Sequence, residues 1–80
     1  MITGAQIRAA RALIKLDQKQ IASAADVSVE TIKRLEKIDG PLLSATGNTV
    51  AKIQTALEAS GIEFINTDRG DGVVKLRNDS

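Results

Sequence analysis

The segment spanning residues 17–36, DQKQIASAADVSVETIKRLE, constrains the fold more than any other part of the chain. It contains two short apolar patterns of helical period, separated by a brief break, and a capping residue precedes each pattern. Asp17 with Gln20 has the spacing of a capping box, and Ser28 is placed to cap the second helix. Two helices this short cannot bury their apolar sides against each other alone. The segment therefore predicts further helices that pack behind it.

A first supporting helix is expected from Gly4 to Lys15, where apolar residues recur every three to four positions. Thr3 and Gln6 have capping-box spacing at its start. The third helix is expected to end at about Lys37, before a sequence that cannot continue it. The expected inward-facing apolar residues of the four helices are Ile7, Ala10, Leu13 and Ile14; Ile21, Ala22 and Ala25; Ile32 and Leu35; and Val50, Ile53, Ala56 and Leu57.

A fourth helix is expected after a loop. The Asp-Gly-Pro sequence at 39–41 ends the third helix, because glycine accepts a left-handed conformation and proline cannot continue the hydrogen-bond ladder. The loop is expected to run to Gly47, with Asn48 or Thr49 as the cap of the next helix. Ser60-Gly61 closes that helix.

The remaining residues predict a β-hairpin. The segments 62–66 and 73–77 are rich in β-branched residues, and the polar, glycine-containing stretch 67–72 joins them. Alternation along the first strand puts Ile62 and Phe64 on one face and Ile65 on the other, so one face can pack on the fourth helix while the second face or the edge stays available. The hairpin either closes only its own core or leaves an edge free for a partner.

We therefore predict one mainly α domain with four helices in residues 1–61 and a C-terminal β-hairpin, residues 62–77, packed on it. A chain of 80 residues is too short for two independent cores. No apolar run reaches the roughly 20 residues that cross a bilayer, and no leader pattern is evident. A cytoplasmic location without membrane contact is expected.

The composition excludes several kinds of site. The chain contains no cysteine and no histidine, so neither disulfides nor the usual zinc sites are expected. It also lacks tyrosine, and a nucleophile would have no activating base, so we expect no enzyme activity. We also expect no cofactor, metal or small-molecule ligand. Phe64 is the single aromatic residue, which excludes the stacking surfaces that single-strand binders use. A nucleic-acid partner would therefore be duplex DNA.

The basic residues concentrate in the N-terminal half. Residues 1–37 contain seven Lys or Arg and four Asp or Glu, whereas residues 38–80 contain four basic and six acidic residues. This half is the expected docking region for a polyanion. Ordinary solvated surface is the alternative interpretation of the charge alone.

The pattern from Gln18 to Glu36, Q-x-x-I-A-x-x-A-x-V-S-x-x-T-I-x-x-L-E, resembles the Cro/C1-type (XRE-like) family of helix-turn-helix DNA-binding proteins. The resemblance covers residues 5–60 and includes Arg11 in the first helix. It implies a four-helix, lambda-repressor-like domain whose third helix enters the major groove. Asp26 stands where this family usually has glycine, so a left-handed backbone there would be somewhat unfavourable.

The resemblance also implies roles for individual residues. It makes Arg11 and Glu36 a structural ion pair, and it makes Gln18 a phosphate contact. The expected outward residues of the reading helix are Ser28, Val29, Glu30, Lys33 and Arg34. Side-chain chemistry suits Arg34 for guanine, Glu30 for cytosine and Val29 for a thymine methyl group. Lys33 and Lys37 suit phosphates, while a merely solvated helix face is the alternative for these residues.

The expected function is that of a sequence-specific transcription regulator, in particular a repressor that binds a palindromic operator as a homodimer. No dimerisation helix follows the fourth helix, so the hairpin is the candidate dimer contact. The alternative is a protein-binding module on the same scaffold, either antitoxin-like or anti-activator. Glu30 and the free hairpin edge favour that alternative, because an acidic side chain on the outward face repels phosphate.

Overall fold

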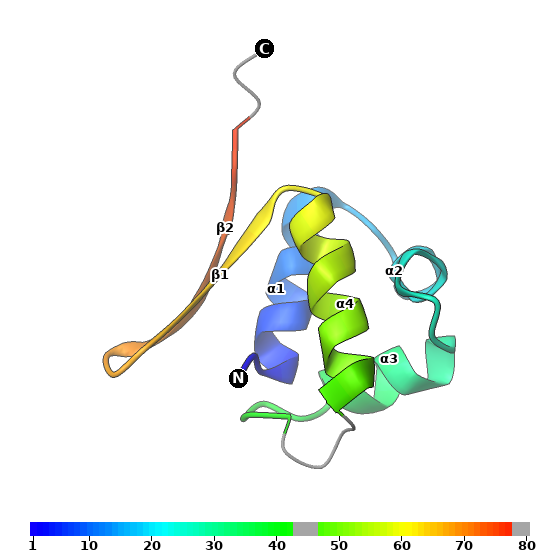
Figure 1. Cartoon of the computed structure of the whole chain (residues 1–80), viewed down its shortest axis with the longest axis horizontal. Coiled ribbons are helices and arrows are strands. Elements are labelled where there is room, and N and C mark those ends of the chain that lie inside the picture. The colour runs from blue at the N-terminus through cyan, green and yellow to red at the C-terminus, as the bar shows by residue number, and fades with distance from the viewer. Residues whose placement is uncertain (43–46, 78–80) are drawn as a thin grey trace.

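The described residues form four helices and a C-terminal hairpin, and this confirms the predicted mainly α architecture (Figure 1). The computed structural model describes residues 1–42 and 47–77. The elements are α1 (Gly4–Ile14), α2 (Gln18–Ala25), α3 (Val29–Glu36), α4 (Gly47–Ala59), β1 (Ile62–Thr67) and β2 (Gly70–Lys75). In the described residues, no helix has the length and apolar character needed to span a membrane.

Side-chain caps open the first three helices as predicted. Both α1 and α2 begin with complete capping boxes, and a serine hydroxyl caps α3. These caps satisfy amide groups that the first helical turn leaves without a partner. The distances from amide nitrogen to capping oxygen are 3.0 Å for Gln6 to Thr3, 2.8 Å for Gln20 to Asp17 and 3.1 Å for Thr31 to Ser28.

One continuous core joins the helices and the start of the hairpin. Most of the predicted inward residues lie in it; the fully buried large side chains are Ile2, Ile7, Ile21, Ile32, Leu35, Leu42, Ile53 and Leu57. The prediction for Leu13 is wrong, since this side chain is 42% exposed on the outer side of α1. Its spacing suits the apolar stripe, but none of the other elements that the structure describes covers that side of the helix near its end.

A contact between the chain start and the segment after α3 was not predicted. The amide of Leu42 donates to the carbonyl of Ile2 at 3.3 Å, and Thr3 forms an isolated bridge with Pro41. Both Ile2 and Leu42 are buried by this pairing. This pairing therefore fixes the segment after α3 to the residues at the start of α1.

The predicted start of α4 is late. The helix begins at Gly47, so Asn48 and Thr49 lie in its first turn and neither is the cap. The glycine suggested a loop, but it stands at a helix end, where its low helix propensity matters least. The rest of the predicted loop, residues 43–46, lies outside the described residues.

The hairpin differs from its prediction in the second strand. Only Asp68 and Arg69 separate β1 from β2, and β2 runs from Gly70 to Lys75 rather than over 73–77. The glycines at 70 and 72 suggested a loop, yet both pair with β1 residues. Pairing with a neighbouring strand overrides their weak strand propensity. Gly70 has φ +155°, a conformation that favours glycine.

Gln6 links the hairpin to α1. Its side-chain nitrogen donates to the carbonyl oxygens of Ile65 and Gly72 at 3.0 and 2.8 Å. Its side-chain oxygen accepts from the Thr3 amide and from the Asn66 side chain, both at 2.9 Å. All the hydrogen-bonding capacity of this buried amide is thereby used. The hairpin is fixed across α1 and α4 on its inner face, and Ile62 joins the core.

Gly4 allows α1 to lie directly against the end of α3. A Cβ atom at this position would overlap the carbonyl oxygens of Leu35 and Ile38. Those carbonyls belong to the last turn of α3 and the residues that follow it. The absence of a side chain at one residue therefore determines how closely the two helices approach.

The Gly4→Ala variant should be less stable than the wild type by about 1–3 kcal/mol, because backbone atoms cannot move aside as a flexible side chain would. Gly47→Ala is the matched control, since nothing lies within 4 Å of its added Cβ. Its stability should stay within about 0.5 kcal/mol of the wild type. Urea denaturation followed by circular dichroism measures both changes. Equal stability of the two variants would contradict the close packing at Gly4.

Candidate nucleic-acid interface

The turn between α2 and α3 has the left-handed residue that the sequence suggested. Asp26 caps the end of α2 with φ 57° and ψ 48°. The next amide, of Val27, returns to the carbonyl of Ala22 at 3.0 Å, which closes the helix. Aspartate tolerates this conformation better than most residues with a Cβ atom. The sharp turn brings α3 against α2, while α2 also packs on α4 and α3 on α1 (Figure 1).

A buried carboxylate ties α1, α2 and α3 together. The guanidinium of Arg11 donates to both oxygens of Glu36, at 2.8 and 2.9 Å. The side-chain amide of Gln18 donates to the same carboxylate at 3.0 Å. Glu36 is only 4% exposed, so its charge depends on these partners. The ion pair expected from the resemblance is therefore present, and it fixes α3 to the rest of the domain.

The environment of Arg11 keeps its charge in place. The hydrogen bond to Glu36 raises the pKa of Arg11, the negative charges of Glu36 and Asp17 raise it further, and partial burial opposes them. A cation whose pKa is raised in the folded state makes its full contribution to stability at any pH below its ordinary pKa. That contribution is lost only as the pH rises through the higher folded value. The positive charge of Arg11 is therefore insensitive to pH near neutrality.

The end of α3 has its own cation. Arg8 on α1 donates to the carbonyl oxygen of Glu36 and to the carboxylate of Asp39, the latter at 2.8 Å. A positive charge at this position interacts favourably with the negative end of the helix dipole. Sequence reasoning assigned no role to Arg8. It orients α3 from its C-terminal end, while the ion pair with Arg11 acts from the side.

The outer face of α3 is open. Glu30, Arg34 and Lys37 follow one another at spacings of four and three residues, so they share one side of the helix. All three are exposed, whereas Ile32 and Leu35 on the opposite side are fully buried. Within the described part of the chain, neither Arg34 nor Lys37 has a side-chain hydrogen bond or salt bridge. These groups are available to a ligand.

Other candidate residues are placed less freely. Val29 is half-buried and packs against the core, so only part of its side chain faces solvent. The hydroxyl of Ser28 caps α3 and also contacts the Thr31 hydroxyl at 2.8 Å. The side-chain nitrogen of Gln18 is held by Glu36, and the residue is half-buried at the start of α2. The side-chain nitrogen of Gln18 is therefore already engaged in the structural cluster around Glu36.

A shallow hollow lies between the starts of α2 and α3. Its lining residues are Asp17, Gln18, Lys19, Val29 and Lys33. Lys33 is exposed at the side of the α3 face, and Lys19 is exposed on α2. Sequence reasoning counted Lys19 only in the charge balance, although its position after the Asp17 cap could have placed it near the reading helix.

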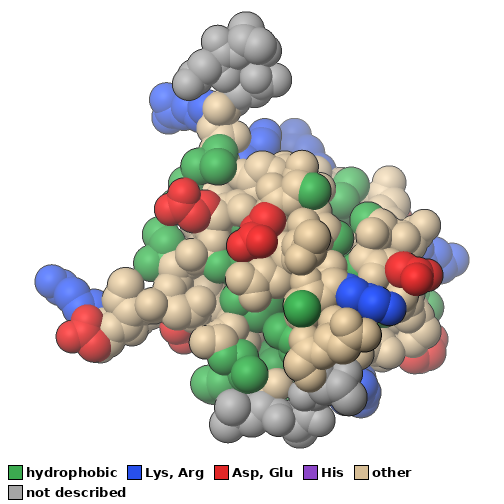
Figure 2. All heavy atoms as spheres, in the orientation of Figure 1, with side chains coloured by type: hydrophobic (Ala, Val, Ile, Leu, Met, Phe, Trp, Pro, Cys, Tyr) green, Lys and Arg blue, Asp and Glu red, His purple; other side chains and the backbone are tan. Residues whose placement is uncertain are grey.

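The charges of this surface are mixed, with a basic excess. Four exposed cations belong to it (Lys19, Lys33, Arg34 and Lys37), against the exposed carboxylates of Asp17 and Glu30. The face seen in Figure 2 likewise intersperses basic and acidic side chains. Cations on a protruding helix suit the phosphates that border a groove, and mixed donors and acceptors suit base edges.

Glu36→Gln should destabilise the protein by about 2–3 kcal/mol, because a neutral amide presents donors to the Arg11 guanidinium. Asp39→Asn is the matched control: Asp39 pairs with Arg8, but its side chain is 83% exposed. The control should lose less than about 1 kcal/mol, as exposed ion pairs do. Urea denaturation compares the two. A similar loss in both variants would contradict the structural role of the buried carboxylate.

The comparisons with known proteins assign no function to this surface. Neither protein-family models nor curated proteins match the chain.

Proposed function

We propose that this protein is a sequence-specific transcription regulator that binds duplex DNA with α3 in the major groove. The observation that carries the proposal is the outer face of α3. It is exposed and carries cations that have no partner among the described residues, while the inner face is buried and fixed by the Arg11–Glu36 ion pair. A rigidly held helix with a free polar face is what groove recognition requires.

The residues of the face divide into two roles. Arg34 lies in the middle of the exposed side, where its planar guanidinium suits the O6 and N7 atoms of guanine. Glu30, one turn earlier, suits the amino group of cytosine. Lys37 lies farther along the exposed side of α3, and Lys33 lies beside it. Both side chains suit phosphates. The amides at the start of α2 can add a backbone contact with phosphate.

Glu30 makes selectivity the main feature of the proposed interaction. Its carboxylate repels phosphates, so binding to arbitrary DNA should be weak, and a correct base partner should matter correspondingly more. The expected regulator acts in the cytoplasm as a repressor, because occupying a promoter is sufficient to block transcription. A palindromic operator would match a homodimer, with half-sites about one helical turn apart.

Selection of bound duplexes from a random pool should enrich a palindrome. On the enriched duplex, Arg34→Ala should weaken binding about tenfold or more and relax the preference at one base pair. Arg69→Ala is the matched control, because Arg69 lies in the hairpin turn on the opposite side of the molecule from α3 (Figure 1). Fluorescence polarisation measures both. Equal affinities of Arg34→Ala and the wild type would count against the proposal.

The salt dependence of binding distinguishes the alternative of a protein-binding module. Contacts with several phosphates should lower the affinity for DNA by about a decade or more between 50 and 200 mM salt. Lys33→Ala and Lys37→Ala should each reduce that slope by about one unit. No enrichment of any duplex, together with an affinity that ignores salt, would favour an antitoxin-like or anti-activator role.

A further inference from the structure

Among the residues that the structure describes, the outer edge of β2 pairs with no other strand. The Leu76 amide donates to the Gly61 carbonyl at 2.7 Å, and hydrogen-bonded pairs in an antiparallel ladder recur at every second residue. The register of β1 and β2 then leaves the backbone N–H and C=O groups of Asp71, Val73 and Lys75 pointing away from β1. Such a row of groups is a template for another strand.

The charges along this edge are complementary to themselves. In an antiparallel pair of β2 strands centred on Val73, Asp71 of each copy lies opposite Lys75 of the other. The three residues with outward backbone groups then pair only with one another, so the ladder and both ion pairs form in the same register. β1 has a single charged residue, Glu63, so pairing it with itself produces no opposite charges.

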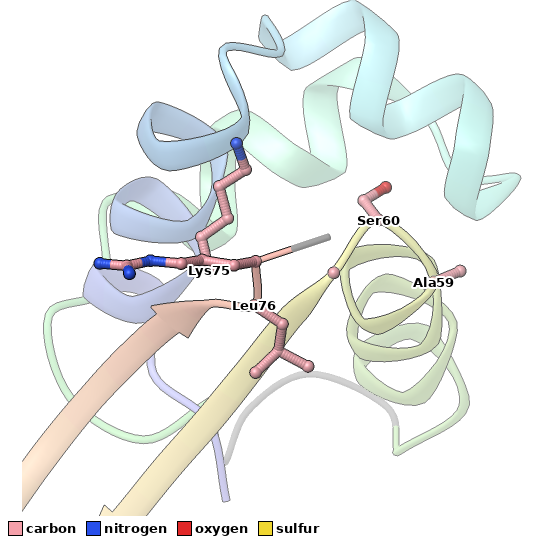
Figure 3. Close-up of a pocket in the computed structure, with 6 residues that line it drawn as sticks. Ala59, Ser60, Lys75 and Leu76 are labelled. Atoms are coloured by element: carbon pink, nitrogen blue, oxygen red, sulfur yellow. The ribbon is translucent and has the colours of Figure 1, made fainter. Parts of the chain in front are cut away.

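Both charged groups are accessible for this pairing. One carboxylate oxygen of Asp71 accepts from the Asn66 side chain at 2.9 Å, and the residue is exposed. Lys75 is exposed, and its ammonium group has no partner among the residues the structure describes. Figure 3 shows Lys75 and Leu76 extending to opposite sides of the strand end, as strand alternation requires.

The molecule leaves space beside β2. A hollow lies between β2 and α1, and its lining residues are Thr3, Ala5, Gln6, Ala9, Asp39, Asp71, Gly72 and Val73. The residues that α1 contributes to its wall include Ala5 and Ala9, which are small. A second β2 strand placed at the edge would direct its own Val73 toward this hollow. Ala5 and Ala9 thus leave room on this wall, whereas the side chain of Gln6, which also lines the hollow, is already held by hydrogen bonds to the hairpin.

We propose that the occupant of this edge is β2 of a second copy of the chain, so that two hairpins form one four-stranded antiparallel sheet. The inference deepens the proposed function by naming the dimer surface, and its link to an operator rests on that function. The edge pairing itself is a property of the protein without DNA.

The proposed dimer has twofold symmetry, as a palindromic operator has. Two antiparallel strands of one sheet are related by a twofold axis normal to the sheet. The helices lie on one face of the hairpin, and the axis maps that face onto itself. Both copies of α3 would therefore lie on the same side of the four-stranded sheet, away from it (Figure 1).

Exchanging the charges tests the register. Asp71→Lys and Lys75→Asp each place like charges opposite one another twice, so each variant alone should dimerise about tenfold or more weakly than the wild type. An equimolar mixture of the two variants restores both attractive pairs and should form the heterodimer. Analytical ultracentrifugation without DNA measures the affinities, and native mass spectrometry identifies the heterodimer by mass.

The matched controls are Lys52→Asp and Glu58→Lys on α4, which change the same charges away from β2 and should dimerise like the wild type. Circular dichroism checks the fold. If a charge reversal unfolds the hairpin, the neutral variants Asp71→Asn and Lys75→Gln are used instead. Each should weaken the dimer by a smaller factor than the charge reversal.

A wild type that stays monomeric up to about 1 mM would overturn the inference, because edge pairing would then be negligible. A mixture that fails to restore the dimer, or variants that dimerise like the wild type, would overturn it equally. Monomers that still bind the selected duplex would contradict this surface alone. Dimers that bind no duplex would contradict the proposed function alone.

Discussion

The buried carboxylate of Glu36 is the interaction on which the arrangement of α3 depends. Three helices contribute to it, because Arg11 comes from α1, Gln18 from α2 and Glu36 from α3. An unpaired charge at this depth would be strongly unfavourable, so the three helices are stable only in the arrangement that pairs it. Burial of Ile32 and Leu35 supplies the apolar part of the same contact. Together they fix one side of α3 and leave the other side to solvent.

The hairpin is attached to this body by a second polar cluster. Gln6 stands at the start of α1, where it both completes the helix cap and holds the carbonyl groups of Ile65 and Gly72. The inner face of the hairpin is thereby fixed, while Ile65, Val74 and Leu76 remain exposed, and Figure 2 shows hydrophobic side chains along that side of the molecule. α3 and the hairpin thus lie on different sides of the domain (Figure 1).

Features that depend on a few neighbouring residues could be predicted from the sequence. The caps of Thr3, Asp17 and Ser28 involve residues three apart, and the helical period identifies most of the core. The ion pair of Arg11 and Glu36 followed from the resemblance and is confirmed. The exposure of the α3 face follows from its period, but whether that face contacts DNA remains a prediction.

Features that depend on distant residues could not be predicted. The second role of Gln6 involves a carbonyl 59 positions away, which no local pattern encodes. The early start of β2 at Gly70 results from pairing with β1, which outweighs the turn preference of glycine. Leu42 is buried because it pairs with Ile2, 40 positions earlier and just before α1. Val29 is partly buried against the core, and its outward position in the helical period did not predict this packing.

The most direct measurement of the central claim is a titration of the ¹⁵N-labelled protein with duplex DNA, followed by amide chemical shifts. The account predicts that the shifts concentrate on α3 and the first turn of α2, with the inner face of the hairpin unaffected. Shifts that concentrate on the hairpin, with α3 unchanged, would contradict the assignment of α3 as the DNA-reading helix.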